Sequence, residues 1–387
     1  MAAMDRRELL SSAAGWAAGA CGLGCGWGLV WPSKAQAARG AEAPGVGADK
    51  PRREIDFYTQ LADKRIQCFV CPLHCKLNDG ETCFCRTRTN YGGRLFTDAY
   101  ENPCIIATDP IEKLPLNHYL PGSKTLTIAC GGCNLRCLYC QNWQQSQVRP
   151  KELKMFRLTP AEAVEGAASQ GIRSIAFGYT EPVVFLEYAK DIAKLAKQRG
   201  LRVVVATAAF VDPEPLLDFA QQVDAFVVAL KAFDEDLYHR TTGVRLEPVK
   251  TALETIKTKT KCWLEIVNLV VPTYNDGPKM IAGMSAWIAQ RLGRDVPVHF
   301  ARFVPMYRLE DLPRTSVQTL EQAVAVARRA GLRYVYTSNI APHKDNDTCC
   351  PNCHAVIIKR LGFKVLEDRA GKGACPQCRR ALPGVWA

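Results

Sequence analysis

Short apolar runs rich in β-branched residues alternate with amphipathic segments from residue 125 onward. The apolar runs have the length of buried strands, and the segments between them have helical periodicity. We predict strands at Thr125–Ala129, Ser174–Phe177, Arg202–Ala206, Ala225–Leu230, Cys262–Val271, Val298–Phe303 and Tyr334–Tyr336. Repeated strand–helix units predict a parallel α/β sheet, open or curled into a partial barrel, with function at the carboxyl ends of the strands.

The predicted helices have clear end signals. Thr159–Glu162 is a capping box with proline at the first helical position. The helical segment Val183–Arg199 is closed by Gly200. A later helix is closed by Gly331, and its apolar face consists of Leu320, Ala323, Val324 and Ala327.

The first fifty residues differ in character from the rest of the chain. Arg6 and Arg7 precede an uncharged, Ala/Gly-rich stretch that runs to Ser33, and Ala35–Ala37 fits a small-residue cleavage site. This pattern predicts a twin-arginine export signal over residues 1–37, followed by a linker over 38–50. We therefore expect export to the periplasm. The alternatives are an uncleaved membrane anchor and a cytoplasmic protein.

The rest of the chain divides at its cysteine groups. We predict a cysteine-rich N-terminal module over 51–117, the α/β core over 118–340 and a tail over 341–387. Most of the 18 cysteines fall in C-x-x-C-like clusters, which indicates metal sites rather than disulfides. The net charge of +12 is carried by scattered basic residues, so we expect no nucleic-acid partner.

Three cysteines follow directly after the first predicted strand, at Cys133, Cys137 and Cys140. An iron–sulfur cube prefers four thiolates, so three leave one iron open to bind a small molecule. Gly131 and Gly132 permit close backbone approach at the start of this loop. The alternative is a three-cysteine zinc site that a distant histidine completes.

Two further cysteine groups flank the core. In the tail, Cys350, Cys353, Cys375 and Cys378 have the two-knuckle spacing of a zinc ribbon, the alternative being a redox-active dithiol pair. This predicts a structural metal, because the tail is too short to build a core of its own.

In the N-terminal module we predict one structural metal, held by Cys68, Cys71, Cys75 and Cys85. Cys83 is then spare, and His74 either replaces one cysteine or faces solvent. Zinc is favoured for a compact all-thiolate site, and an auxiliary iron–sulfur cluster is the alternative.

The C-x-x-x-C-x-x-C spacing, with an aromatic residue before the last cysteine, is the signature of radical S-adenosylmethionine (SAM) enzymes. Between Cys68 and Trp386 the chain resembles the radical SAM member of the AmmeMemoRadiSam system, which is related to the activating enzymes of pyruvate formate-lyase and other glycyl radical enzymes. The resemblance rests on Cys68–Cys75, Asp109–Pro115, Cys133–Trp143, Tyr179–Pro182, His299–Phe303 and Cys375–Trp386.

This resemblance implies a radical SAM partial (β/α)6-type barrel whose 4Fe-4S cluster is held by Cys133, Cys137 and Cys140. The residues implied to contact SAM or shape its pocket are Tyr139, Gly178, Glu181, Thr207, Lys231, His299 and Asn339. Two positions depart from the family pattern: Ala229 replaces an acid, and Ala208-Ala209 replaces an asparagine-glycine pair.

Glu181 also has a case that does not depend on the resemblance. An acid that precedes Pro182 at a helix start and a strand end suits a cationic ligand such as the SAM amine. The alternative is an acid that only caps the helix.

The function implied is reductive cleavage of SAM to a 5′-deoxyadenosyl radical, which abstracts hydrogen from an unidentified substrate. The alternatives are an activating enzyme of a glycyl radical enzyme and a non-enzymatic iron–sulfur electron-transfer or assembly protein. The implied partners are SAM, a one-electron donor such as flavodoxin or ferredoxin, and the Memo-like and AMMECR-like proteins of the same system.

Overall fold

The computed structural model describes residues 52–154 and 156–386. The predicted export signal and linker, residues 1–50, lie outside the described residues. From Arg53 onward the chain forms one unit. Within the described ranges, no helix combines the length and the apolar character that a membrane crossing requires.

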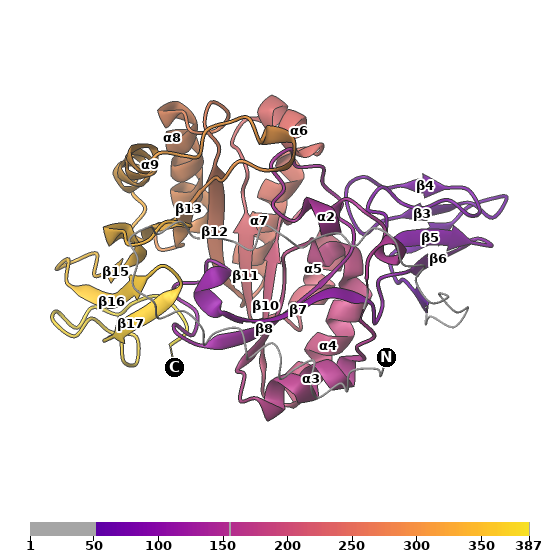
Figure 1. Ribbon diagram of the computed structural model, residues 1–387, viewed down its shortest axis with the longest axis horizontal. Coiled ribbons are helices and arrows are strands. Elements are labelled where there is room, and N and C mark those ends of the chain that lie inside the picture. The colour runs from indigo at the N-terminus through magenta and orange to yellow at the C-terminus, as the bar shows by residue number, and fades with distance from the viewer. Residues whose placement is uncertain (1–51, 155, 387) are drawn as a thin grey trace, which may run out of the picture. The chain divides into compact units, whose positions relative to one another are not determined.

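An eight-stranded sheet lies at the centre of this unit (Figure 1). Its strands are β7 (Pro103–Pro110), β8 (Lys124–Cys130), β9 (Ser174–Phe177), β10 (Arg202–Thr207), β11 (Ala225–Ala229), β12 (Trp263–Val270), β13 (Val298–Arg302) and β14 (Val335–Ser338). They lie side by side in chain order, and β8 to β14 all run parallel. The predicted parallel α/β fold is confirmed. Each of the seven predicted strands is present in the described chain. The sheet therefore has seven parallel strands, one more than the six of the expected (β/α)6-type barrel.

Strand β7 was not predicted from the sequence. It lies within the range that we expected to form the N-terminal module, yet it pairs antiparallel with β8 from Pro103 opposite Cys130 to Pro110 opposite Lys124. The N-terminal region therefore supplies an edge strand to the main sheet. No pairing joins β7 to β14 among the described residues, so the sheet is open.

Helices connect the parallel strands and cover the outer face of the sheet (Figure 1). They are α2 (Trp143–Ser146), α3 (Pro160–Ser169), α4 (Leu186–Gln198), α5 (Pro213–Ala220), α6 (Glu235–Thr242), α7 (Glu247–Lys259), α8 (Pro278–Trp287) and α9 (Val317–Arg329). Shorter turns are η2 (Ile111–Lys113), η3 (Pro150–Glu152), η4 (Pro182–Phe185), η6 (Tyr307–Leu309), η7 (Lys344–Asn346) and the π-helical η5 (Ile288–Leu292).

The end signals in the sequence correspond to real helix ends. Thr159 accepts a hydrogen bond from the Glu162 N–H, and the Glu162 carboxylate accepts one from the Thr159 N–H, so the capping box before α3 is complete. Gly200 and Gly331 follow α4 and α9 with φ of 72° and 102°, a region that glycine adopts without a steric penalty. The predicted helix Val183–Arg199 forms as the 3₁₀ turn η4 followed by α4.

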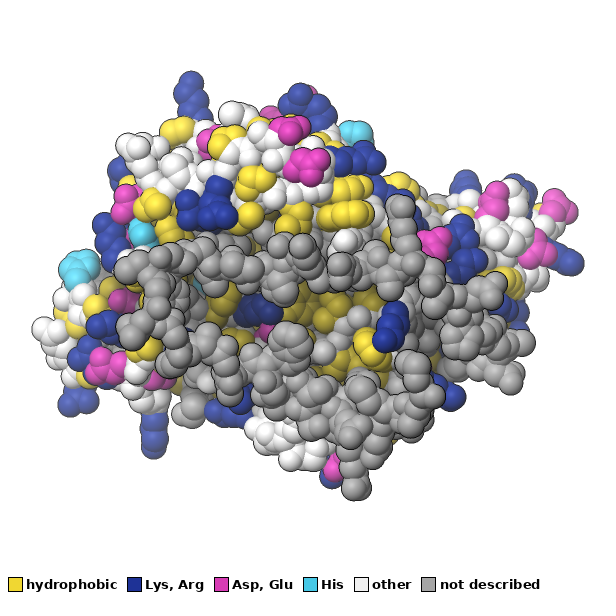
Figure 2. Space-filling model, in the orientation of Figure 1, with side chains coloured by type: hydrophobic (Ala, Val, Ile, Leu, Met, Phe, Trp, Pro, Cys, Tyr) yellow, Lys and Arg dark blue, Asp and Glu magenta, His cyan; other side chains and the backbone are white. Residues whose placement is uncertain are grey.

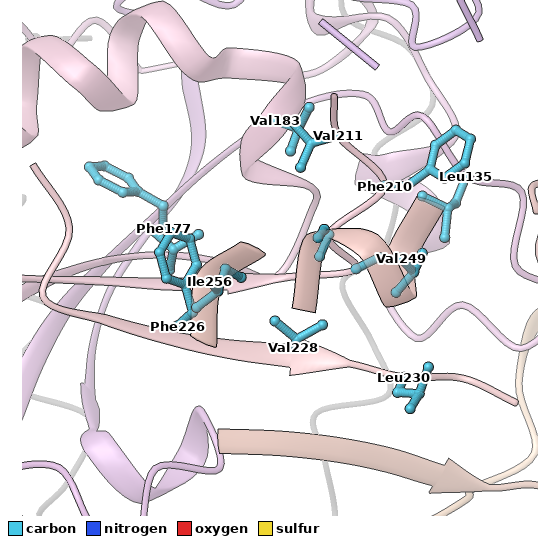
Figure 3. Close-up of a cluster of buried hydrophobic side chains, with 14 of the residues drawn as sticks. Leu135, Phe177, Val183, Phe210, Val211, Phe226, Val228, Leu230, Val249 and Ile256 are labelled. Carbon is cyan, nitrogen blue, oxygen red and sulfur yellow. The ribbon is translucent and has the colours of Figure 1, made fainter. Parts of the chain in front are cut away.

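The two faces of the sheet are buried by different parts of the chain. Phe177 of β9 and Phe226 of β11 join the large core under the helices, where Figure 3 shows them close to Ile256 of α7. On the other face, small residues such as Ala176 and Val204 pack against the segment 111–120, which contributes Leu114 among others. The strand interiors are therefore apolar on both faces, as is typical of parallel sheets.

Three small sheets complete the structure. In the N-terminal module, one sheet has the order β1-β6-β5 and another the order β2-β3-β4. Their strands are β1 (Arg53–Glu54), β2 (Tyr58–Gln60), β3 (Ile66–Cys68), β4 (Lys76–Leu77), β5 (Arg88–Tyr91) and β6 (Arg94–Thr97). The tail forms an antiparallel sheet of β15 (Thr348–Cys349), β16 (Val356–Leu361) and β17 (Lys364–Asp368).

Charged side chains are mixed on the visible face of the molecule. Figure 2 shows Lys and Arg side chains dispersed around this face, with acidic side chains among them.

Candidate functional site

The loop that carries Cys133, Cys137 and Cys140 begins at the carboxyl end of β8, the first parallel strand. Gly132 has a φ of 96°, and a Cβ atom there would lie 2.6 Å from the Cys85 carbonyl oxygen. Only glycine tolerates both constraints. Gly132 therefore lets the loop turn directly against the N-terminal module.

The sulfur atoms of this loop sit in a buried environment. Cys137 is 7% exposed, and Cys133 and Cys140 are partly buried. Burial raises the pKa of Cys133 and raises that of Cys137 to about 11. The Leu135 N–H donates to the Cys133 sulfur at 3.4 Å, and the Cys140 sulfur lies 3.2 Å from the Ser146 hydroxyl. Ionised thiolates here need a nearby positive charge, which a metal centre provides.

The separation of the sulfur atoms bears on which metal centre fits this loop. In a tetrahedral zinc site with Zn–S bonds of about 2.3 Å, the sulfurs lie about 3.8 Å apart. Among the described residues, a group of three or more ligand atoms within 4.8 Å of one another occurs in the tail and not at this loop. In an iron–sulfur cube each thiolate binds a different iron, so wider spacing is suitable. The loop therefore fits a cluster better than a single ion.

A cation and a carboxylate face the three cysteines. Lys231, just beyond the end of β11, is half-buried. Burial alone would lower the pKa of Lys231, but the charges of Cys137, Cys140, Cys133 and Glu181 outweigh this effect and raise it. Lys231 is therefore held as an ammonium group beside the cysteine loop, where it can attract an anionic ligand group.

Glu181 lies at the end of β9 and is 2% exposed. Its carboxylate accepts hydrogen bonds from the Thr207 hydroxyl at 2.6 Å, the Ala208 N–H at 2.8 Å and the Val183 N–H at 3.2 Å. Burial raises the pKa of Glu181, while these hydrogen bonds and the charge of Lys231 oppose the rise. Glu181 does cap η4, and one of the roughly four acceptor positions of a carboxylate is left for a ligand.

Thr207 acts through Glu181 rather than independently. Its hydroxyl donates to Glu181 and accepts from the Ala209 N–H at 2.8 Å. The Ala208-Ala209 pair, which departs from the family pattern, thus contributes two backbone N–H groups that fix this end of β10. Backbone groups perform this task whatever the side chain.

The remaining residues implied to contact SAM occupy different environments. Gly178 is buried at the end of β9, where an added Cβ would lie 3.3 Å from the Ala206 side chain. Tyr139 is 4% exposed and packs within the core beside Cys137. Asn339 is exposed after β14, with a φ of 60°. The structure thus brings Glu181, Thr207 and Lys231 to the cysteine loop more directly than Asn339.

His299 belongs to a separate buried network. It is fully buried in β13, where its Nε2 lies 2.7 Å from a Glu265 carboxylate oxygen, and its ring stacks on Tyr336. The other Glu265 interactions include the N–H groups of Asn117 and His118. The described contacts of His299 are therefore with residues of the sheet interior, and its role at the SAM pocket stays a prediction.

A polar triad that the sequence reasoning left without a role lies next to Glu181. The Tyr179 hydroxyl donates to Asp109 at 2.6 Å, and the Lys113 ammonium lies 2.7 Å from both groups. Asn142 from the cysteine loop donates to the Tyr179 carbonyl at 2.6 Å. Tyr179 has a φ of 60°. No helical spacing rule could have suggested this pair, because Asp109 lies near the end of strand β7 and Lys113 lies in the turn η2.

The four predicted tail cysteines come together. All four sulfur atoms lie within 4.8 Å of one another, with 3.5 Å between Cys350 and Cys378 and 3.5 Å between Cys353 and Cys375. The neighbouring Cys349 is exposed and outside the group. This arrangement suits one tetrahedral ion.

The N-terminal module brings together one cysteine more than we predicted. A small cavity is lined by Cys68, Cys71, Cys75, Cys83 and Cys85. Cys83, which we expected to be spare, is among them and is buried. His74, the alternative ligand, also lines the cavity, and its Nε2 lies 2.8 Å from Asp212.

The chain is similar to several known proteins. Residues 127–282 match the family described as the Radical SAM superfamily. An uncharacterized protein of Methanocaldococcus jannaschii is 41% identical over 330 residues, which cover 84% of this chain and 97% of that protein. The pyruvate formate-lyase-activating enzyme of Clostridium pasteurianum is 27% identical over 172 residues, 42% of this chain and 67% of that enzyme. A domain of a pyruvate-formate lyase-activating enzyme from Bacteroides vulgatus superposes with a TM-score of 0.38 at 16% identity, covering 43% of this chain and 99% of that domain.

Proposed function

Because the chain belongs to the radical SAM superfamily and is related to the pyruvate formate-lyase-activating enzymes, we propose that Cys133, Cys137 and Cys140 hold a 4Fe-4S cluster that binds SAM. When bound, the cluster and SAM supply a 5′-deoxyadenosyl radical, which abstracts hydrogen from the substrate. The observation that carries this proposal is the arrangement of three cysteines after β8, with Lys231 and Glu181 facing them. Superfamily membership argues against a non-enzymatic carrier.

The chain's own residues have distinct tasks in this proposal. Glu181 accepts a hydrogen bond from the SAM ammonium group through its remaining acceptor position. Lys231 attracts the SAM carboxylate. Thr207 is a positioning residue for Glu181, because its hydroxyl already bonds that carboxylate. As the family resemblance implies, Tyr139 lies against the adenine, and the Gly178 backbone helps to hold the SAM amine.

The test is anaerobic reconstitution of the purified protein with iron and sulfide. Dithionite and SAM are then added, and 5′-deoxyadenosine is measured. We expect the nucleoside to form only in reconstituted protein. A reconstituted protein with full iron content that binds SAM but releases no 5′-deoxyadenosine would contradict the proposal.

A second candidate function is the activation of a glycyl radical enzyme. It is supported by the 27% identity to the Clostridium pasteurianum activating enzyme over 172 residues. The discriminating experiment offers candidate glycyl radical proteins to the reconstituted protein and looks for a glycyl radical by electron paramagnetic resonance.

We further propose that the chain is the radical SAM member of the AmmeMemoRadiSam system, on the strength of the motifs from Cys68 to Trp386. Its partners would then be the Memo-like and AMMECR-like proteins, with flavodoxin or ferredoxin as the electron donor. Copurification of tagged protein with those two proteins tests the assignment. We also propose zinc for the tail, and twin-arginine export directed by residues 1–37. A reporter fused to that segment, with Arg6 and Arg7 replaced by lysine as the control, tests the export.

A further inference from the structure

A cavity of about 590 Å³ opens at the amino ends of three neighbouring strands of the main sheet. Its lining includes Arg202 at the start of β10, Asp224 just before β11 and Trp263 at the start of β12. The cysteine loop and Lys231 lie instead at the carboxyl ends of β8 and β11. The cavity is therefore separate from the site described above, and its volume is within the range of small-molecule sites, about 300–1,000 Å³.

Positive side chains predominate among the charged residues of this cavity. The lining contains Lys197 of α4, Arg202 of β10, Lys259 of α7 and Lys261 just before β12, with Asp224 as the single acid in the described lining. Among the described residues, the ion pairs of the lining consist of the one between Arg202 and Asp224, at 3.3 Å. The three lysine ammonium groups therefore have no carboxylate partner in the described chain, and they favour an anionic ligand.

A buried hydroxyl group indicates a specific ligand rather than general positive charge. Tyr119 lines the cavity and is 1% exposed, and its hydroxyl has no hydrogen-bond partner among the described residues. The Tyr119 backbone is fixed by a bridge to Val385, and the next residue, Leu120, donates its N–H to the Val385 carbonyl at 2.7 Å. Buried polar groups are normally paired in folded proteins. The Tyr119 O–H is thus a fixed donor that a ligand acceptor would satisfy.

The remaining polar groups of the lining are largely satisfied by the protein itself. The Trp263 Nε1–H donates to the Glu265 carboxylate at 3.0 Å, so the ring of Trp263, and not its N–H, is available to a ligand. The Cys262 thiol donates to the Val223 carbonyl at 3.1 Å. Leu217 adds aliphatic surface to the lining. The cavity therefore combines cations and one free O–H donor with aromatic and aliphatic surface.

We propose that this cavity binds a phosphorylated small molecule. A phosphate group carries a charge of about −1.5 to −2 at pH 7 and three acceptor oxygens, which match several ammonium groups and the Tyr119 hydroxyl. Lysine binds phosphate as a point charge, whereas planar bidentate recognition of a carboxylate uses arginine. Here the Arg202 guanidinium is already paired with Asp224, so phosphate is favoured over carboxylate. The inference does not rest on the proposed function, because none of these residues belongs to the cysteine loop or to the strand ends beside it.

Calorimetric titration of the full-length protein at low ionic strength tests the site. The probes are uridine diphosphate, uridine, which lacks the phosphates, and tricarballylate, a tricarboxylate of similar charge. Uracil replaces adenine in the probe so that it does not resemble the nucleoside of SAM. We expect uridine diphosphate to bind, uridine to show no measurable binding, and tricarballylate to bind about 10-fold more weakly than uridine diphosphate.

A set of variants locates the binding. Tyr119→Phe removes only the hydroxyl and should weaken the binding of uridine diphosphate roughly 10-fold. The double variant Lys259→Gln with Lys261→Gln should weaken it by about the same factor. Lys257→Gln is the matched control, because Lys257 is an exposed lysine of α7 outside the described lining. Without a probe, Tyr119→Phe should unfold at a temperature equal to or above that of the parent, because it buries no unpaired hydroxyl.

Each outcome supports or overturns the inference. Absence of uridine diphosphate binding, or an equal loss in Lys257→Gln, would show that the cavity is not a phosphate site. Tighter binding of tricarballylate than of uridine diphosphate would show that the ligand class is wrong. Tyr119→Phe with a lower unfolding temperature and unchanged affinity would assign the hydroxyl a structural role only. A variant with Cys133, Cys137 and Cys140 all replaced by alanine should bind uridine diphosphate as the parent does. Loss of binding in that variant would place the probe at the cysteine loop and overturn this inference, while leaving the proposed function intact.

Discussion

The tail and the N-terminal module both gather cysteines on small antiparallel sheets, but they gather them differently. In the tail, two C-x-x-C knuckles bring four sulfurs within 4.8 Å of one another. In the module, five thiols line one cavity, and no three of the described sulfurs there form such a group. A tight quartet suits one tetrahedral ion. Sulfur spacing in the fold therefore distinguishes two cysteine groups that cysteine counting cannot.

The first way to break this comparison is to remove the tail ion. We expect Cys353→Ser to lose one equivalent of zinc and to unfold the tail sheet. Structural zinc contributes an apparent 10–16 kcal/mol to small domains, which is about their whole folding free energy. Elemental analysis and hydrogen exchange of the β16 amides measure the two effects. Cys349→Ser is the matched control, since Cys349 is exposed and outside the quartet. Unchanged zinc in Cys353→Ser would refute the single-ion site.

The second prediction concerns the removal of a cluster ligand from the cysteine loop after β8. We expect Cys137→Ala to reduce 5′-deoxyadenosine formation below detection, because the remaining two thiolates cannot hold the cluster that binds SAM. The zinc content of the tail should not change. Cys262→Ala, which removes a partly buried thiol at the start of β12, is the control and should retain activity. If Cys137→Ala were as active as the parent, Cys137 would not be a ligand of the cluster.

Local patterns predicted what depends on local physics. The seven parallel strands, the Thr159 cap and the tail knuckles all follow from periodicity or spacing along a few residues. These features can be predicted without knowledge of distant partners, because strand periodicity, a helix cap and a C-x-x-C knuckle are each patterns of neighbouring residues.

Long-range pairings could not be predicted in the same way. Cys83 lies only two residues from Cys85, but its place in the same cavity as Cys68 depends on how two loops fold over β3. His299 of β13 has Glu265 of β12 as its partner, and no sequence pattern predicts this pairing between strands. Strand β7 was missed because an antiparallel edge strand takes its place by pairing with β8, not by its own periodicity.

The third prediction concerns how the tail is attached to the rest of the unit. His118 is fully buried, with Nδ1 2.6 Å from the Pro383 carbonyl and Nε2 2.6 Å from the Tyr336 hydroxyl. Burial lowers the pKa of His118 from 6.5 to about 4, against the attraction of Glu265. Between about pH 6.5 and 4, His118 is therefore protonated in the unfolded chain and neutral in the folded chain. Stability is fully present above pH 6.5 and falls as the pH drops towards 4, by up to about 3 kcal/mol.

Denaturant unfolding between pH 7.5 and about 5, with zinc in excess, measures this slope. His118→Gln keeps a polar side chain but cannot take up a proton in this range, so its slope should be shallower than that of the parent. Protonation of the cysteine ligands is common to both proteins and cancels in the difference. Identical slopes would show that His118 does not link the tail to acid stability.

The smallest expected effect concerns whether the strand ends beside the cysteine loop bind a ligand or only cap a helix. Glu181 already accepts three hydrogen bonds from Thr207, Ala208 and Val183. A hydrogen bond that the SAM ammonium donates to the carboxylate should contribute about 1.5–3 kcal/mol, or roughly 10- to 100-fold in affinity. Loss of the cap alone should cost only about 0.5–1 kcal/mol of folding stability.

Glu181→Gln keeps the shape and removes the charge, so we expect SAM affinity to fall more than stability. Thr207→Val is the matched control, because it removes one bond to Glu181 and leaves the charge in place. If Glu181→Gln binds SAM as tightly as the parent while its unfolding free energy falls, Glu181 is a cap, and the ammonium of SAM is bound elsewhere.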